Sequence, residues 1–351
     1  MNINFKSKKL IKECDLHGDF LTGGLVHDAW KRLDHVVHQT PLRTSATTNL
    51  RTDKNVYFKM ENQQKTGAFK FRGASYKLMR LSRAQLDRGV ITASAGNHAQ
   101  GLALAAYKLN AKATIYMAES TPESKVQATR GYGAEVVLTG ESFQEAYEAS
   151  LKQQEKCGAT YVHPFDDYDI MAGQGTIALE LLQQEKRIDT IIVPIGGGGL
   201  ISGIAVGAKA VNPDIKIIGV QAAAAPAMHT AYHKGIVQKL GKVSTIAEGI
   251  AVKQPGENTL PLINNYVDDV ITVSEAEIAD AMVNMLERGK SLVEGAGAAA
   301  FAGLLSHNDQ IKSRHCGVIV SGGNLDIGKL AHIQSLANQL KPEQSHAALS
   351  F

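Results

Sequence analysis

The sequence predicts an α/β fold with open, parallel-rich sheets and helices on both faces. Short β-branched apolar runs alternate with amphipathic or alanine-rich segments along most of the chain, which is typical of parallel α/β architecture. The length of 351 residues corresponds to two domains at roughly 150 residues each, or to one large unit with an insertion. No internal repeat of about 20 to 50 residues is present, so a solenoid is not expected.

The expected elements follow in chain order. Apolar residues between Val26 and Val37 fall on one helical face before the first strand, and the Thr40-Pro41 pair is expected to end that helix. Runs of β-branched and aromatic residues predict strands at 55–60, 89–94, 113–117, 135–138, 159–163, 190–195, 215–221, 270–273 and 316–321. The segments between them predict helices at 100–109, 122–132, 142–154, 172–184, 200–211 and 274–288.

Charge and composition narrow the classes of partner. The 37 basic residues nearly balance the 34 acidic ones, for a net charge of +3, so neither a nucleic-acid partner nor a membrane surface is expected. No apolar run reaches the ~18 residues that a membrane helix needs. The three cysteines, Cys14, Cys157 and Cys316, are widely spaced and form no CxxC pair, which disfavours a disulfide framework. We therefore expect a soluble protein of the cytoplasm.

The glycine content is high, with 33 glycines, and four of them are consecutive. Gly196, Gly197, Gly198 and Gly199 follow a predicted strand and precede a helix, so backbone N–H groups can close around a phosphate-sized anion. No Walker lysine follows. A dinucleotide site would need an acid about 20 residues further on, where this chain has Gln221. A nucleotide-binding α/β protein without further chemistry remains the alternative from another class.

Two other segments stand out beside the glycine loop. Lys70 is flanked by Phe69 and Phe71 and by small residues, and a lysine in apolar surroundings has a lowered pKa and can act as a nucleophile or base. Ser321 begins the segment SGGNLD directly after the last predicted strand. Because ligands of open α/β sheets collect at the carboxyl ends of parallel strands, we expect Ser321 to lie near the glycine loop.

Five motifs occur together: TGAFKFRGA, SAGNHAQG, PIGGGGLISG, EGAGAAA from Glu294, and SGGNLD. In this order they resemble the fold-type II pyridoxal-phosphate enzymes, and within them the short, catabolic-type threonine/serine dehydratases, over roughly residues 28–340. The resemblance implies a tryptophan synthase β-like fold, with a large cofactor domain from 1–83 plus 163–351 and a small substrate-carboxylate domain at 84–162. The tail PEQSHAALSF is too short for a C-terminal regulatory domain, so none is expected.

The resemblance also implies roles for individual residues. Lys70 would be the catalytic lysine that forms a Schiff base with pyridoxal 5'-phosphate, with Phe69 beside the cofactor. Asn97 would bind the ring hydroxyl and Ser321 the ring nitrogen. The cofactor phosphate would be held by Gly196, Gly197, Gly198 and Gly199. The substrate carboxylate would be held, largely through N–H groups, by Ser94, Ala95, Gly96, Asn97 and His98.

The activity so implied is β-elimination of L-threonine, and also of L-serine, to 2-oxobutanoate or pyruvate plus ammonia. A lyase for another 3-hydroxy amino acid, such as 3-hydroxyaspartate or phenylserine, is the alternative within the class. A serine racemase is disfavoured because Ala95 stands where racemases of this family carry a serine. No metal is expected, since Gln221 and Ala227 replace the acids of cation-dependent relatives. The resemblance implies a homo-oligomer, dimer or tetramer.

The segment after the strand predicted at 159–163 contains side chains of the types that bind metals. The segment from His163 onward contains three aspartates, Asp166, Asp167 and Asp169. Short acidic side chains next to a predicted helix start commonly cap loops by accepting backbone hydrogen bonds. We therefore interpret these residues as loop caps rather than as a metal site.

Overall fold

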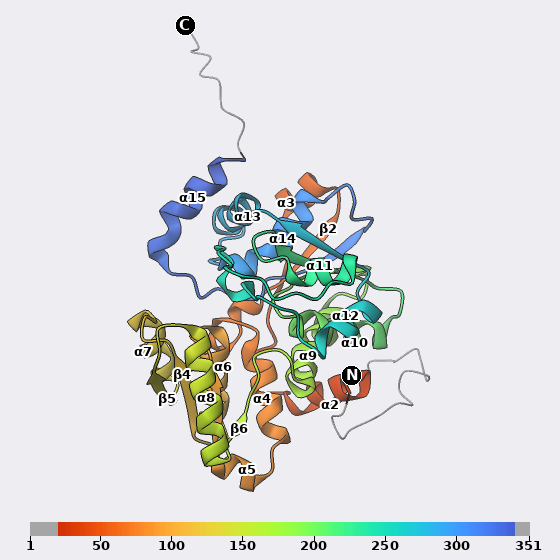
Figure 1. Ribbon diagram of the computed structural model, residues 1–351. Coiled ribbons are helices and arrows are strands. Elements are labelled where there is room, and N and C mark those ends of the chain that lie inside the picture. Colours follow the sequence, from red (N-terminus) through yellow and green to blue (C-terminus); the bar gives the residue numbers. More distant parts are fainter. Residues whose placement is uncertain (1–19, 341–351) are drawn as a thin grey trace, which may run out of the picture.

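The computed structural model describes residues 20–340, so Cys14 and the segment from residue 341 lie outside the described residues. Within this part the strands form two sheets (Figure 1). A six-stranded sheet has the order β1-β2-β10-β7-β8-β9, and a four-stranded sheet has the order β5-β4-β3-β6. The β1–β2 pair is antiparallel, and the other strand pairs are parallel. This confirms the predicted fold class.

The nine predicted strands are present with small shifts at their ends. The strands are β1 (Leu42–Arg43), β2 (Asn55–Lys59), β3 (Val90–Ala93), β4 (Ala113–Met117), β5 (Glu135–Leu138), β6 (Thr160–Tyr161), β7 (Thr190–Pro194), β8 (Lys216–Ala222), β9 (Asp269–Val273) and β10 (His315–Ile319). The two-residue strand β1 was not expected. It is too short to show the alternating pattern that predicts a strand.

The six helices predicted after the first strand are also present. The α-helices are α2 (Gly23–Arg32), α3 (Ala46–Thr52), α4 (Lys70–Arg80), α5 (Arg83–Arg88), α6 (Asn97–Lys108), α7 (Glu123–Gly131), α8 (Phe143–Cys157), α9 (Tyr168–Gln184), α10 (Gly199–Val211), α11 (Ala227–Lys234), α12 (Thr259–Tyr266), α13 (Glu275–Glu287), α14 (Gly295–Ser306) and α15 (Leu330–Asn338). Short 3-10 turns are η1 (Glu61–Gln63), η2 (Lys65–Gly67), η3 (Glu248–Ile250) and η4 (Ile327–Lys329).

One predicted helix boundary is wrong. Helix α2 ends at Arg32 and does not continue to the Thr40-Pro41 pair. His35 adopts a left-handed backbone conformation with φ of 61°, which a continuing α-helix cannot contain. The apolar residues that follow still pack against the core as part of a turn, so their spacing imitated a helical face.

The six-stranded sheet separates two apolar layers, because successive strand residues point to opposite faces. Val56 and Phe58 pack into the layer formed with α13 and α14, whereas Tyr57 packs into the layer formed with α9 and α10. Ile192 and Ile191 on β7 divide in the same way. Helices therefore cover both faces of this sheet, as Figure 1 shows.

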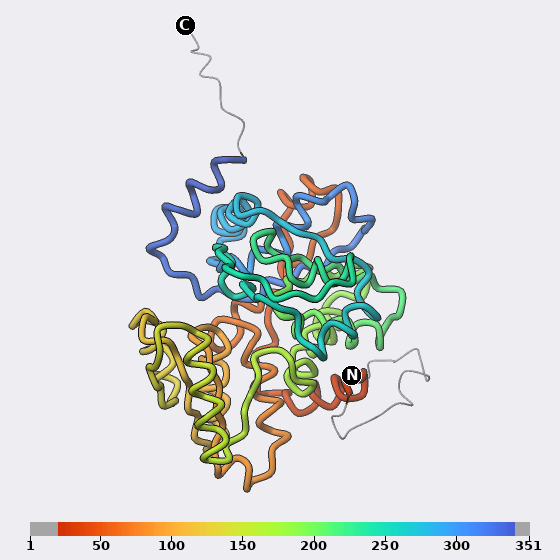
Figure 2. Tube along the Cα trace, in the orientation of Figure 1, coloured from red at the N-terminus to blue at the C-terminus, as the bar shows by residue number. Residues whose placement is uncertain are grey.

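The four-stranded sheet lies in the lower part of the molecule, together with α4 to α8 (Figures 1 and 2). Val90 and Ile115 pack with α6 on one face, and Ile91 and Tyr116 pack with α8 on the other. Within residues 20–340, no helix is both long and apolar enough to cross a membrane.

Candidate active site

Lys70 is the first residue of α4, and the chain around it is fixed by contacts with distant segments. The backbone N–H of Phe69 donates to Ser321 O over 3.1 Å. The Lys70 Nζ donates to Pro164 O over 2.6 Å and lies 5.1 Å from the centre of the Phe69 ring. Burial lowers the pKa of Lys70 to about 8, although the nearby charge of Glu294 acts in the opposite direction. An amine with this pKa is partly neutral near pH 7 and can act as a nucleophile or a base.

The loop before Lys70 is held in an unusual conformation. Thr66 has a φ of 66°, a region that is costly for a residue with a branched Cβ. The side chain of Asn324 donates from Nδ2 to Thr66 O over 2.8 Å. A Cβ on the neighbouring Gly67 would lie 2.4 Å from Asn324 Oδ1, so glycine is required for this close approach. The SGGNLD segment thus supports the loop that leads to Lys70.

Asn97 begins α6 and connects the two sheets. Its Nδ2 donates to Glu294 Oε1 over 2.7 Å, and its Oδ1 accepts from Asn324 Nδ2 over 2.8 Å. Glu294 lies directly before α14, which packs on the six-stranded sheet. The side chain of Asn97 is therefore oriented from both of its polar ends.

The turn from Ser94 to His98 offers backbone N–H groups rather than side chains. Ser94 Oγ accepts from Gly96 N over 3.3 Å, and a Cβ on Gly96 would meet no atom within 4 Å. Burial and the nearby Lys70 lower the pKa of His98 to about 3. Its ring is buried, with Nε2 3.0 Å from Val162 O. The α6 N-terminus suits an anion through its positive dipole end.

The four glycines form the turn between β7 and α10. Gly198 has a φ of 103°, and a Cβ on Gly197 would lie 2.3 Å from the ring of Phe165. Within residues 20–340, the backbone N–H groups of 196–200 have no hydrogen-bond acceptor. Pro164, the residue before Phe165, accepts the hydrogen bond from Lys70 Nζ. The same chain segment therefore brings the glycine turn and the lysine together.

Ser321 lies at the end of β10 and is buried. Its Oγ donates to Ala296 O over 3.2 Å, at the start of α14. The next residue, Gly322, is backed by Glu294: a Cβ there would lie 2.2 Å from Glu294 Oε1. The structure thus brings Lys70, Asn97 and the Ser321 segment around Glu294.

Glu294 is the site residue to which the sequence assigned no role. Burial raises its pKa to about 7, against the hydrogen bond from Asn97. A glutamate within the apolar motif EGAGAAA is an unusual choice for a buried helix start, and that was the available signal. Near pH 7 this carboxyl group is close to half protonated, so it can either donate or accept a hydrogen bond.

Two of the three aspartates after His163 accept hydrogen bonds from backbone N–H groups, as expected of caps, whereas in the described part of the chain Asp169 does not. Asp166 accepts from the backbone N–H groups of Glu257, Asn258 and Thr259. Asp167 caps the N-terminus of α9 by accepting from Asp169 N and Ile170 N. The carboxylate of Asp169 instead forms ion pairs with Lys77 and Arg80. In the described chain, no group of three or more His, Cys, Asp or Glu residues could hold a metal ion.

Gln221, the residue that argued against a dinucleotide, is fully buried beside the glycine turn. Its Oε1 accepts from His229 N over 2.9 Å, and its Nε2 lies 3.5 Å from Gly196 O. The amide thus connects the glycine turn to helix α11. A neutral amide in this position offers no negative charge to a ribose hydroxyl or a cation.

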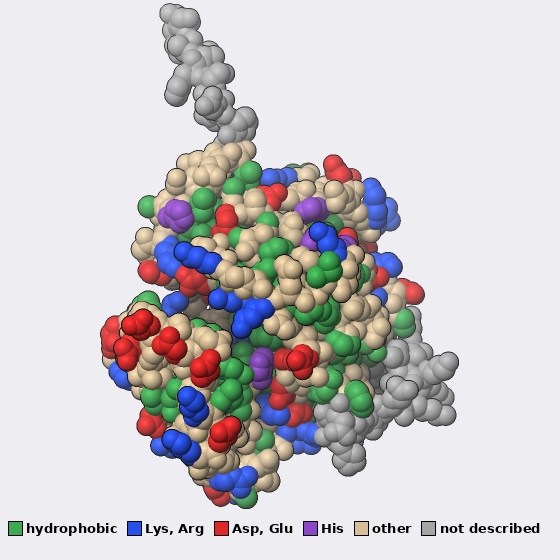
Figure 3. Space-filling view, in the orientation of Figure 1, with side chains coloured by type: hydrophobic (Ala, Val, Ile, Leu, Met, Phe, Trp, Pro, Cys, Tyr) green, Lys and Arg blue, Asp and Glu red, His purple; other side chains and the backbone are tan. Residues whose placement is uncertain are grey.

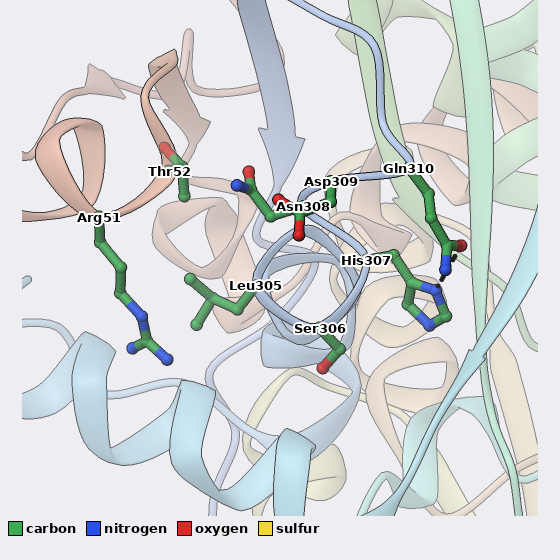
Figure 4. A pocket seen from close by; sticks show the side chains of 8 residues that line it. All are labelled: Arg51, Thr52, Leu305, Ser306, His307, Asn308, Asp309 and Gln310. Atoms are coloured by element: carbon green, nitrogen blue, oxygen red, sulfur yellow. Dashed lines mark hydrogen bonds between the residues drawn. The ribbon is translucent and has the colours of Figure 1, made fainter.

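The surface is hollowed between the part that contains the four-stranded sheet and the part that contains α13 and α14 (Figure 3). A separate pocket of about 310 Å³ lies elsewhere, between α3 and the end of α14 (Figure 4). Arg51, His307 and Gln310 are among its lining residues. None of the predicted site residues lines it, and its polar surface has no counterpart in the chemistry described above.

The sequence and the structure were compared with those of known proteins. The sequence pattern of the family described as "Pyridoxal-phosphate dependent enzyme" matches residues 33–322. The chain belongs to this family. It is 51% identical over 303 residues to an L-threonine ammonia-lyase of Geobacter sulfurreducens, covering 86% of this chain and 75% of that protein.

Two solved structures are similar throughout. Threonine deaminase isoform 2 of Solanum lycopersicum, in its processed form, has a TM-score of 0.87 at 39% identity, covering 90% of this chain and 88% of that one. Maize serine racemase has a TM-score of 0.85 at 39% identity, covering 90% and 97%. These relatives share the fold and include both a deaminase and a racemase.

The residues present fit pyridoxal 5'-phosphate. The glycine turn packs so closely on Phe165 that a Cβ at Gly197 would lie 2.3 Å from its ring, and the free N–H groups of the turn suit a phosphate. Lys70 supplies a buried amine with a lowered pKa. A basic side chain at the phosphate is not needed, because a helix N-terminus carries roughly half a positive charge.

Proposed function

We propose that the protein catalyses the β-elimination of L-threonine, and also of L-serine, to a 2-oxo acid and ammonia. The observation that carries this proposal is the position of Lys70. Its Nζ donates to Pro164 O, beside the phenylalanine that packs on the glycine turn, and its own Cβ would lie 3.3 Å from a Cβ at Gly101 of α6. The pKa of its amine is lowered to about 8. The relative from Geobacter sulfurreducens is named L-threonine ammonia-lyase. The net change converts threonine to 2-oxobutanoate plus ammonia, with water lost and then regained.

For the cofactor-binding residues we propose the roles that the resemblance implies. The glycines from Gly196 to Gly199 would hold the phosphate, Asn97 the ring hydroxyl and Ser321 the ring nitrogen, with Phe69 beside the ring. When bound, the cofactor serves as an electron sink for the α-carbon of the substrate. Ser321 has a neutral hydroxyl, which stabilises a charged ring less than a carboxylate would.

The protein groups would orient the substrate and move its proton. The N–H groups of the turn from Ser94 to His98, with Ala95 and Gly96 between them, would bind the substrate carboxylate. Lys70 Nζ would accept the proton from the α-carbon, since burial lowers its pKa to about 8 and so makes the neutral amine easier to form. Glu294 would hold Asn97 in place through its 2.7 Å hydrogen bond.

Elimination is favoured over racemisation by the residue expected on the face of the substrate α-carbon opposite to Lys70. Racemisation needs a second group that can return a proton from the side opposite to Lys70. Ala95, which by the resemblance occupies the place of that group, has no proton to exchange. The proposed main reaction is therefore elimination, in spite of the close similarity to a serine racemase.

The proposal also covers the domain division, the oligomeric state and the location of the protein. The two sheets suggest a large cofactor domain of 1–83 plus 163–351 and a small domain of 84–162, with the site between them. We propose a homo-oligomer, dimer or tetramer, acting on a small amino acid. The widely spaced cysteines, of which Cys157 and Cys316 are free thiols, agree with a cytoplasmic location.

The test is a 2-oxo-acid assay with threonine, serine, 3-hydroxyaspartate and phenylserine, combined with chiral analysis of the remaining amino acid. We expect 2-oxobutanoate from L-threonine at the highest kcat/KM and little D-amino acid. If kcat/KM is higher for 3-hydroxyaspartate or phenylserine than for threonine, that amino acid is the preferred substrate and the proposal of threonine is wrong. A protein that shows no visible absorption band after addition of pyridoxal phosphate would contradict the proposal as a whole.

A further inference from the structure

Four buried charged residues form a cluster directly behind Lys70. They are Lys59 at the end of β2, Glu61 in η1, Arg72 in α4 and Glu180 in α9. The side chains of Lys59, Glu61 and Arg72 are fully buried, and that of Glu180 is 7% exposed. Two cations and two anions give a net charge of zero. We call this group the buried charge cluster.

Arg72 is the centre of the buried charge cluster. Its Nε and Nη2 donate to the two oxygens of Glu61 over 2.7 and 2.8 Å. Its Nη1 and Nη2 donate to the two oxygens of Glu180 over 2.6 and 2.9 Å. Nη1 also donates to Thr176 Oγ1 over 3.2 Å. All five N–H donors of the guanidinium are used in a fixed, planar fork, which a lysine could not reproduce.

The remaining groups of the cluster are satisfied as well. Lys59 Nζ donates to Glu180 Oε2 over 2.8 Å, to Thr40 O over 2.8 Å and to Gln184 Oε1 over 3.0 Å. Burial opposes the charge of Arg72, but the two glutamates outweigh burial and hold its pKa above the ordinary value. The cluster is therefore a fully paired set of charges that joins three segments of the chain: 59–61, α4 and α9.

The cluster acts on the turn of helix that carries Lys70. Residues two positions apart on an α-helix point about 200° away from each other, so Arg72 and Lys70 project in nearly opposite directions. The next residue, Gly73, packs against α9 so closely that a Cβ on Gly173 would lie 2.6 Å from Gly73 Cα. With Arg72 locked on one side, α4 cannot rotate about its axis without breaking the forks. Lys70 is thereby aimed away from α9.

A contribution to the stability of the fold does not by itself explain why these four charged residues are buried together. A buried set of ion pairs often contributes no more than well-packed apolar residues of the same volume, whereas its directional bonds define one geometry. From the double fork, the burial and the position two residues after Lys70, we infer that Arg72 is a positioning residue that sets the orientation of the Lys70 amine. This inference rests on the proposed function of Lys70.

The experiment compares three variants as holoenzymes with the wild type. Arg72→Lys keeps the charge and removes the forks, and Thr176→Val removes one acceptor with little change of volume. Ile278→Ala, at a buried core position within α13, is the control for lost stability. The measurements are kcat and KM with threonine, the dissociation constant of pyridoxal phosphate from fluorescence titration, and the melting temperature.

The inference predicts that Arg72→Lys lowers kcat at least tenfold with KM within threefold, and weakens cofactor binding at least fivefold. Thr176→Val should lower kcat two- to threefold. Ile278→Ala should lower the melting temperature while kcat and cofactor affinity stay within twofold of wild type. The inference is wrong if Arg72→Lys and Thr176→Val both keep kcat and cofactor affinity within twofold of wild type. It is also wrong if Ile278→Ala lowers kcat and cofactor affinity as much as Arg72→Lys does.

Two further outcomes are informative. If Arg72→Lys does not fold, the effect of Thr176→Val on kcat and cofactor affinity decides the question. If the wild-type enzyme forms no 2-oxo acid from any of the four substrates, the proposed function fails. The cofactor affinities of the variants then still test the orientation of Lys70, because that measurement does not depend on turnover.

Discussion

Asn97 Nδ2 and Glu294 Oε1 lie 2.7 Å apart and join helix α6, beside the four-stranded sheet, to the start of α14 on the six-stranded sheet. The two residues are 197 positions apart in sequence. Their contact fixes a side chain that we assign to the cofactor ring and shields a carboxyl group from water. Burial raises the pKa of this glutamate to about 7, although the hydrogen bond from Asn97 acts in the opposite direction, and this shift can be measured.

The pKa of Glu294 predicts a pH dependence of stability in the cofactor-free protein. Its pKa is about 7 in the folded protein against an ordinary value of 4.5, so the folded state binds the proton more tightly. The stability that Glu294 contributes is fully present below about pH 4.5 and is lost as the pH rises through about 7. Glu294→Gln cannot ionise, so the melting temperature of this variant relative to wild type should rise between pH 5 and pH 8. A difference that stays constant over this range would show that Glu294 titrates normally.

Gly197→Ala should weaken cofactor binding. The new methyl group would lie 2.3 Å from the Phe165 ring, so the ring or the turn must move. We expect the dissociation constant of pyridoxal phosphate to increase at least about tenfold, which corresponds to about 1.4 kcal/mol. Gly241→Ala is the matched control, since a Cβ there meets no atom within 4 Å. Equal affinities of the two variants would argue against a phosphate site at this turn.

Ala95→Ser tests why elimination prevails. A hydroxyl at this position would supply a group able to exchange a proton on the face opposite to Lys70. We expect the variant to form D-serine from L-serine at a rate at least about tenfold above wild type, measured by chiral chromatography. Ala93→Ser, two residues earlier at the end of β3, provides a control hydroxyl outside the turn. No gain of D-serine in Ala95→Ser would mean that Ala95 does not face the α-carbon.

Lys70→Ala should abolish turnover and the visible absorption band. Loss of a nucleophile and general base lowers rates by roughly 10²–10⁴ or more. Lys108→Ala, at the end of α6, should leave kcat within twofold of wild type. The comparison uses kcat with threonine and absorbance spectra of both variants. Residual activity of Lys70→Ala at the wild-type level would reject the role of this lysine.

Local pattern was sufficient to predict the fold, because most strands and helices here follow their expected periodicity. The strand at 113–117 and the neighbours Val56 and Tyr57 are clear cases, since short runs of apolar residues that are buried on both faces of a sheet are visible in the sequence. The end of α2 was mispredicted because the left-handed conformation of His35 leaves no trace in the apolar spacing.

The candidate site was only partly accessible from the sequence. Lys70, the glycine turn and the SGGNLD segment lie in recognisable motifs, so they could be named in advance. The role of Glu294 depends on Asn97, and the role of Arg72 depends on Glu180, more than 100 residues further along the chain. Such contacts are created by the packing of helices and strands, and a single sequence does not display them.

The most direct test of the central claim is to locate the cofactor. The holoenzyme is reduced with borohydride, digested and analysed by mass spectrometry, in parallel with the threonine assay. We predict one cofactor-derived adduct per chain on the peptide that contains Lys70, in protein that converts threonine to 2-oxobutanoate. An adduct on another lysine, or turnover without an adduct at Lys70, would contradict the account.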